Sequence, residues 1–190
     1  MKTSLAMLTL AVSCAFAGNA MALTKAEYKT QKDRVEAVYK AAKEKCASLS
    51  ANAKDICQAE AKGTEKVAKA ELEAQYKPGP SQDKKVRDAK ANAAYDVAKE
   101  KCDDLAGNTK DVCVKDAKAA RTTAKADAKV SKVSAEANKD KAGAVADAKK
   151  DAASDKNDAM YKAAKERCDA MSGNAKDSCQ NDAKVKFGMK

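Results

Sequence analysis

The chain has 190 residues, of which 44 are alanine and only 22 are leucine, isoleucine, valine or phenylalanine. Its formal net charge is +10, from 38 basic and 28 acidic residues. So few bulky aliphatic side chains exclude an ordinary large apolar core, and the composition is typical either of a disordered chain or of long, charged helices. Histidine is absent, which excludes histidine-based acid–base catalysis, Ser-His and Cys-His nucleophile pairs and histidine-bound metals.

The N-terminus predicts a signal peptide over residues 1–22. Lys2 supplies the positive start, residues 5–17 form the apolar run, and Ala20-Met21-Ala22 matches the small-x-small cleavage site. We expect the mature chain to begin at Leu23, in the periplasm or outside the cell. The apolar run is too short to span a bilayer, and no later segment approaches the roughly 18 apolar residues that a transmembrane helix needs.

A rival interpretation places a lipoprotein box at Ala11-Val12-Ser13-Cys14, with Cys14 acylated after cleavage. Ala11 stands where leucine is usual, and the apolar stretch before it is very short. We therefore expect cleavage near Ala22 and no lipid.

The mature chain contains three copies of one module. Each copy reads Y-x-x-A-K-E-[KR]-C-x-x-[LM]-x-[GA]-N-x-K-D-x-C without gaps, starting at Tyr39, Tyr95 and Tyr161. Residue types that recur at so many fixed offsets are a strong signal of a tandem structural repeat.

Within each module the pattern predicts two helices and a tight turn. Apolar residues before the first cysteine recur at steps of three and four, which indicates one helix face that reaches Leu49 in the first copy. Gly107 and Gly173 suit a left-handed helix end, and the asparagine that follows can begin the next helix. The first copy has Ala51 instead, so we expect a slightly different turn there, either strained by about 1 kcal/mol or with Asn52 left-handed.

Six cysteines remain after removal of the signal peptide, an even number that argues for disulfides in an exported chain. Each sequential pair is 11 residues apart, and the turn lies midway between its two members. Six cysteines allow 15 connectivities, but an antiparallel hairpin brings the members of each sequential pair to the same height on facing helices. We therefore predict the disulfides Cys46–Cys57, Cys102–Cys113 and Cys168–Cys179, each stabilising its module by about 3 kcal/mol.

The segments between the modules also look helical. Residues 58–76 contain no proline, whereas the Pro-Gly-Pro-Ser sequence at 78–81 cannot continue a helix, and we expect the helix to resume near Asp83. Residues 114–167 contain no proline and only Gly143, so we expect one helix of more than forty residues. Its weak apolar stripe fits a loose coiled coil or a solvated single helix.

The predicted fold is therefore all-α, with three tandem disulfide-stapled αα-hairpins joined by long, partly solvated helices in an elongated shape or a loose bundle. The expected parts are a signal peptide (1–22), hairpin module 1 (23–77), a Pro/Gly linker (78–81), hairpin module 2 (82–130), an Ala/Lys-rich helical connector (131–150) and hairpin module 3 (151–190).

Positive and negative charges are interspersed along every segment, which is typical of a solvated helix surface. The functional alternative is attraction to anionic envelope polymers or lipid headgroups. No nucleic-acid partner is expected, because export removes the usual target and the tyrosines occupy helix-stripe positions instead of an exposed stacking platform.

The module, the mature start Leu-Thr-Lys-Ala-Glu-Tyr and the phrase Ala-Glu-Leu-Glu-Ala-Gln-Tyr-Lys-Pro resemble a family of small exported Gram-negative proteins rich in lysine and alanine. The resemblance covers nearly the whole chain. Similar sequences often carry the label TolA-like or cell-envelope protein, which reflects a helical composition shared with the spanning domain of TolA. The resemblance implies no catalytic, cofactor-binding or metal-binding residue.

The expected function is that of a non-enzymatic periplasmic helical repeat protein with a structural, scaffolding or stress-protective role in the cell envelope. One alternative is a cationic adaptor for anionic envelope components. A second is a thiol/disulfide or metal-binding protein, although C-x10-C lacks the close C-x-x-C spacing that makes a disulfide labile. Expected partners are envelope proteins, anionic envelope polymers or another copy of the chain, with no cofactor.

Overall fold

The computed structural model describes residues 22–137 and 141–189. Nearly all of the predicted signal peptide, up to residue 21, lies outside the described residues, and so does Cys14 with the alternative lipid-attachment site. Among the helices of the described part, none is long and apolar enough to cross a membrane.

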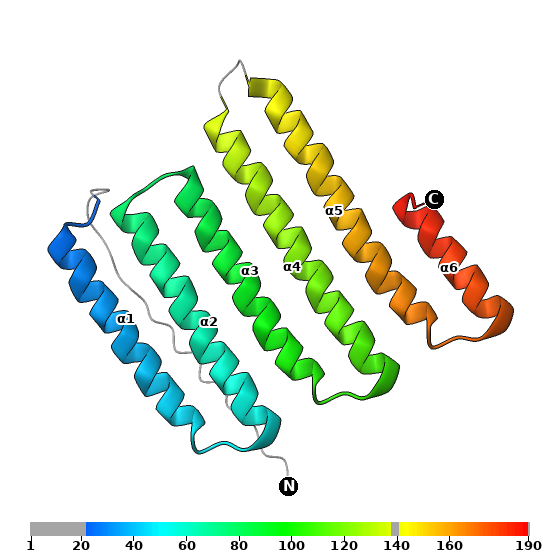
Figure 1. The fold of residues 1–190 in the computed structure, drawn as a ribbon, viewed down its shortest axis with the longest axis horizontal. Helices are drawn as coiled ribbons and strands as arrows, with labels where there is room; N and C mark the ends of the chain where they lie inside the picture. The colour runs from blue at the N-terminus through cyan, green and yellow to red at the C-terminus, as the bar shows by residue number, and fades with distance from the viewer. Residues whose placement is uncertain (1–21, 138–140, 190) are drawn as a thin grey trace, which may run out of the picture.

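The described residues form helices that lie side by side in a single layer, in chain order (Figure 1). Each of these helices packs only against the helix before it and the helix after it. The first and last helices therefore form the two ends of a row. The helices are α1 (Lys25–Cys46), α2 (Ala51–Tyr76), α3 (Pro80–Cys102), α4 (Gly107–Glu136), α5 (Ala142–Cys168) and α6 (Gly173–Phe187).

The prediction of an all-α fold with three disulfide-stapled hairpins is confirmed. The hairpins are α1–α2, α3–α4 and α5–α6, and their turns all lie along one edge of the layer (Figure 1). The end of α2 and the start of α3, like the end of α4 and the start of α5, lie along the opposite edge. The layer thus has a disulfide edge and a linker edge.

One predicted element is wrong, because residues 114–167 do not form a single helix. Helix α4 ends at Glu136, α5 begins at Ala142, and the two pack against each other. A continuous helix would leave its alanine stripe in water, whereas the folded-back arrangement buries Ala148 and Ala152. Burial of apolar surface favours the two-helix arrangement.

The boundary between the first two hairpins is shorter than predicted. Helix α3 begins at Pro80, not near Asp83. Proline suits the first helical position, since its missing N–H would have no partner there and its fixed φ fits the helix. The residue before it, Gly79, has a φ of 155°, a conformation that favours glycine.

The core consists of small side chains. Within residues 22–137 and 141–189, the buried apolar residues apart from Leu72 are alanines and the first cysteine of each module. The helices approach closely as a result, and a Cβ placed on Gly63 would lie only 2.9 Å from the Cβ of Ala93. Such packing gains about 0.8 kcal/mol for each buried methyl group.

The spacing of the buried residues explains why the helices form a row. In α2, Ala61 and Gly63 are both buried, and residues two apart lie about 200° apart around a helix. In α4, Ala126 and Ala128 are buried in the same way. Helices α2 and α4 therefore each have two narrow apolar stripes on opposite sides, one for each neighbour.

The start of α1 is fixed to the end of α2. Thr24 and Glu27 form a capping box at the first turn of α1. The hydroxyl of Tyr28 donates a hydrogen bond of 2.9 Å to the carboxylate of Glu73, and its ring centre lies 4.6 Å from that of Tyr76. The hydrogen bond to Glu73 raises the pKa of Tyr28, because it stabilises the protonated hydroxyl.

We expect the oxidised protein to scatter X-rays as a flat plate. Helices about 9 Å apart and up to about 45 Å long, in a row of six, give a radius of gyration of about 20 Å. A compact chain of this size has a radius of gyration of about 15 Å. Small-angle scattering measures the difference, and a value near 15 Å would mean that the row closes into a bundle.

Candidate functional site

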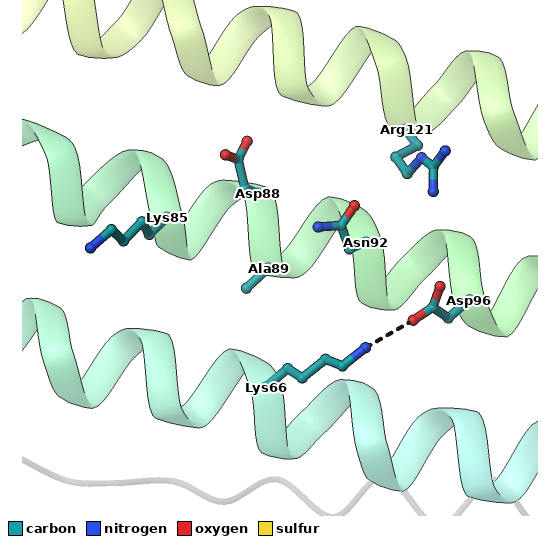
Figure 2. Close-up of a pocket in the computed structure, with 7 residues that line it drawn as sticks. All are labelled: Lys66, Lys85, Asp88, Ala89, Asn92, Asp96 and Arg121. Atoms are coloured by element: carbon teal, nitrogen blue, oxygen red, sulfur yellow. Dashed lines mark hydrogen bonds and ion pairs between the residues drawn. The ribbon is translucent and has the colours of Figure 1, made fainter.

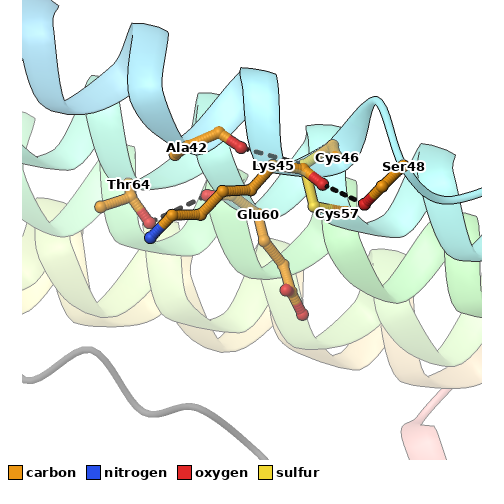
Figure 3. The surroundings of a disulfide bond; sticks show 7 residues. All are labelled: Ala42, Lys45, Cys46, Ser48, Cys57, Glu60 and Thr64. Atoms are coloured by element: carbon orange, nitrogen blue, oxygen red, sulfur yellow. Dashed lines mark hydrogen bonds between the residues drawn. A yellow bond between two sulfur atoms is a disulfide. The ribbon is translucent and has the colours of Figure 1, made fainter.

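The disulfide edge holds the most strongly repeated feature of the molecule. The first cysteine of each pair is almost completely buried, with at most 1% of its surface exposed. Figure 3 shows the first pair, beside a hydrogen bond of 2.9 Å from the hydroxyl of Ser48 to the carbonyl of Lys45. The disulfides are Cys46–Cys57, Cys102–Cys113 and Cys168–Cys179, with Cα–Cα distances of 5.6, 5.7 and 5.7 Å.

These six cysteines are all oxidised. A thiolate is the form that attacks a substrate or binds a metal, so either activity would first require reduction of a disulfide. Among residues 22–137 and 141–189, we find no group of three or more Cys, Asp or Glu side chains that could hold a metal ion.

The turn after each first cysteine has the same backbone in all three modules. The residue before the repeated asparagine is left-handed, with φ values of 48° at Ala51, 54° at Gly107 and 55° at Gly173. The first turn is therefore not different from the others, and the alternative with Asn52 left-handed is wrong, whereas the alternative of a strained Ala51 is what the structure shows. Ala51 itself adopts the conformation, at a cost of about 1 kcal/mol for the crowded Cβ.

The apolar stripe of the first helix in each hairpin ends sooner than predicted. Helices α1, α3 and α5 each end at their first cysteine, so Leu49, Leu105 and Met171 lie in the turns. Their side chains are 41%, 40% and 47% exposed. The disulfide edge thus carries one exposed apolar side chain per module.

Two of the three turns are closed by an ion pair. Lys110 Nζ lies 2.9 Å from Asp103 Oδ1, and Lys176 Nζ lies 2.9 Å from Asp169 Oδ1. The hydrogen bond from the lysine lowers the pKa of each aspartate. This stabilisation is present above the ordinary aspartate pKa of 3.8 and is lost as the pH falls through the lowered value. The first module has Ala47 at this position.

The repeated asparagine joins one module to the next. Its predicted role was to begin the following helix, but its side chain reaches across to a neighbouring hairpin. Asn52 Nδ2 donates to the carbonyl of Glu100 at 2.7 Å, and Asn108 Nδ2 donates to the carbonyl of Glu166 at 3.0 Å. Both carbonyls lie in the last turn of a helix, where intrahelical partners are missing. The only sequence signal for this contact was the recurrence of asparagine at one offset.

Two ion pairs also recur at equivalent positions of the two boundaries between modules. Surface pairs of this kind contribute about 1 kcal/mol at most, but they favour one register of the facing helices. The pairs are Glu60–Lys101 (3.9 Å) and Glu71–Lys90 (2.8 Å) between α2 and α3, and Asp116–Arg167 and Asp127–Lys156 between α4 and α5.

A solvent-open hollow crosses helices α2, α3 and α4 (Figure 2). Three cations line it, of which two are engaged by the protein itself. Lys66 Nζ lies 3.3 Å from Asp96 Oδ2, and the guanidinium of Arg121 lies 3.8 Å from the centre of the Tyr95 ring. Lys85 is the third cation. With this mixture of charges, the hollow has no strong preference for an anionic ligand.

Comparisons of the chain with protein-family models, with curated proteins and with solved structures found no match. The functional argument is therefore based on the geometry of the repeat.

Replacement of Ala51 by glycine should raise the free energy of unfolding by about 1 kcal/mol, because glycine adopts a positive φ without the Cβ clash. The matched changes Gly107→Ala and Gly173→Ala should lower it by a similar amount at the equivalent turns. Chemical denaturation measures all three variants. A destabilised Ala51→Gly protein would contradict a strained first turn.

Removal of the third disulfide should release α6, because this helix has 15 residues and, among the described helices, packs only on α5. Helices α3 and α4 each keep a second neighbour when the second disulfide is removed. In the Cys168→Ser/Cys179→Ser protein, the amides of α6 should lose protection from hydrogen exchange. In the matched Cys102→Ser/Cys113→Ser protein, the amides of α3 and α4 should stay protected, while overall stability falls by about 3 kcal/mol. Equal protection of α6 in both proteins would mean that packing on α5 alone holds it.

Proposed function

We propose that the protein is a non-enzymatic periplasmic scaffold of the cell envelope, with a structural or stress-protective role. The observation that carries this proposal is that the repeated residues hold the hairpins and their boundaries together. Paired cysteines close every hairpin, the repeated asparagine joins successive hairpins, and repeated charges bridge the same boundaries. The repeat therefore preserves a shape, which supports a role performed by that shape.

The arrangement of the layer supports the same function. Each hairpin contacts only its neighbours in the chain, so the surface grows in proportion to the number of modules, as in other repeat proteins. The described helices form a single layer with two broad faces (Figure 1). A scaffold of this kind offers a large, stiff surface for a small number of residues.

The disulfides fit an oxidising compartment outside the cytoplasm. Export through the predicted signal peptide, with cleavage after Ala22, agrees with the position of the first helix. Thr24, the second residue of the mature chain, caps α1, and the backbone N–H of Leu23 donates to the carbonyl of Gln75 at 3.4 Å. We place the mature protein in the periplasm without a lipid on Cys14.

The alternative is a cationic adaptor that binds anionic envelope components. Residues 115–150 are its richest lysine segment, and two of the lysines there form ion pairs with the neighbouring helix. Lys115 Nζ lies 3.1 Å from Glu166 Oε2, and Lys129 Nζ lies 2.9 Å from Asp151 Oδ2. Paired lysines attract a polyanion weakly, and we therefore favour the scaffold.

Envelope protection by a scaffold should depend on closed hairpins more than on surface charge. In a strain that lacks the protein, the exported wild-type chain should restore growth under osmotic stress. A chain with all six mature cysteines replaced by serine, at equal abundance, should not, because each lost disulfide removes about 3 kcal/mol from its hairpin. The matched control Lys118→Gln/Lys125→Gln removes two exposed lysines of the same segment, keeps the hairpins and should restore growth like the wild type.

Binding to vesicles with anionic headgroups distinguishes the scaffold hypothesis from the adaptor hypothesis, and it can be measured with the same set of proteins. The scaffold should bind them weakly at low salt and lose them near physiological ionic strength, where charges are screened beyond about 8 Å. Binding that survives physiological salt, together with loss of growth in the charge variant, would contradict the scaffold and support the adaptor.

A further inference from the structure

The contact between successive modules is built twice from the same parts. The earlier module contributes an asparagine, a carboxylate and a small residue, and the later module contributes a helix-end carbonyl, a cation and an alanine. At the first boundary Asn52, Glu60 and Gly63 meet the carbonyl of Glu100, Lys101 and Ala93. At the second boundary Asn108 and Asp116 meet the carbonyl of Glu166 and Arg167, and Ala119 occupies the position of Gly63.

The outer face of α6 carries the first half of this contact. The equivalent positions of the third module are Asn174, Asp182 and Val185. Asn174 and Asp182 are exposed, and no hydrogen bond or ion pair within the described residues uses their side chains. Val185 is 83% exposed, whereas the equivalent Ala119 is 8% exposed. An apolar residue at an interface position is thus left in solvent.

The outer face of α1 carries the second half. The equivalent positions of the first module are Ala37, Glu44 and Lys45, and all three residues are exposed. The carbonyl of Glu44 accepts a bond of 3.0 Å from the N–H of Ala47. Glu100 accepts the same bond and still has a second lone pair for its asparagine. The carbonyl of Glu44 therefore has the same capacity to accept a further donor.

From these matching halves we infer that α6 of one copy docks on α1 of a second copy, so that the protein assembles head to tail. Asp182 would face Lys45, the side-chain amide of Asn174 would meet the carbonyl of Glu44, and Val185 would pack on Ala37. The two faces differ from each other, so the contact does not close on itself, and repetition extends the row of modules. The functional meaning of this contact rests on the proposed scaffold function. The contact itself is inferred from the equivalence of positions within the repeat.

The intermolecular contact is smaller than the two within the chain. Helix α6 has 15 residues, compared with 26 in α2 and 30 in α4. The ion pair between Glu71 and Lys90 therefore has no counterpart on α6. Val185 is also larger than Gly63 and spaces the helices further apart. The assembly is thus reversible and depends on protein concentration.

Sedimentation velocity of the oxidised, exported protein over a wide concentration range tests the contact. The wild type should form chains of increasing length up to millimolar concentration. Asp182→Lys and Lys45→Glu each place like charges across the contact, and each should weaken association by about fivefold or more. A mixture of the two variants should associate like the wild type, because the new lysine on α6 meets the new glutamate on α1 while native pairs form at alternate contacts.

The control Asp158→Lys makes the same change in net charge as Asp182→Lys, at an exposed position of the inner helix α5, and should associate like the wild type. Circular dichroism should show unchanged helix in every variant, since the substituted side chains are exposed. A protein that stays monomeric, or an association that survives either reversal or is not restored by mixing, would overturn the head-to-tail contact. The scaffold proposal would survive that result, because its growth test depends on the hairpins within one molecule.

Discussion

Alanine faces bury too little apolar surface to hold two helices together in a fixed register. The rest of the structure depends on the interactions that supply the missing stabilisation. A buried methyl group contributes about 0.8 kcal/mol, against about 1.5–3 kcal/mol for a buried leucine or valine side chain. A disulfide that closes so short a loop contributes about 3 kcal/mol, or as much as about four alanine methyls. Each disulfide also fixes the relative heights of the two helices within its own hairpin.

The contacts within a hairpin differ in kind from the contacts between hairpins. Within a hairpin, a covalent bond joins the helices near the turn. Between hairpins, an asparagine side chain and exposed ion pairs act at the same boundary, and each contributes about 1 kcal/mol. The close packing of small residues along the boundary adds the remaining stabilisation. The disulfides therefore make the hairpins the covalently closed units, while the boundaries α2–α3 and α4–α5 depend on helix packing that is at least as extensive as that inside the hairpins.

The hairpins could be predicted from sequence because cysteine spacing and turn residues are local signals. A separation of 11 residues with Gly-Asn or Ala-Asn at its midpoint leaves few alternatives to an antiparallel pair. The break between Glu136 and Ala142 had a weaker signal, since it contains no proline and the adjacent Gly143 lies inside α5. Burial of Ala148 and Ala152 alongside α4 decides it. The row arrangement was missed for a related reason, because a search for one apolar stripe overlooks a helix with two.

The roles of the polar residues were harder to predict, since they depend on partners distant in sequence. Asn52 and Glu100 are 48 residues apart, and no local pattern connects them. A repeat nevertheless contains this information in another form: a residue kept at one offset in every module either acts within the module or acts between modules. If it acts between modules, the terminal modules must expose half of the contact each. The exposed Val185 at one end of the row and the exposed Ala37 at the other are therefore consequences of the repeat that need no separate explanation.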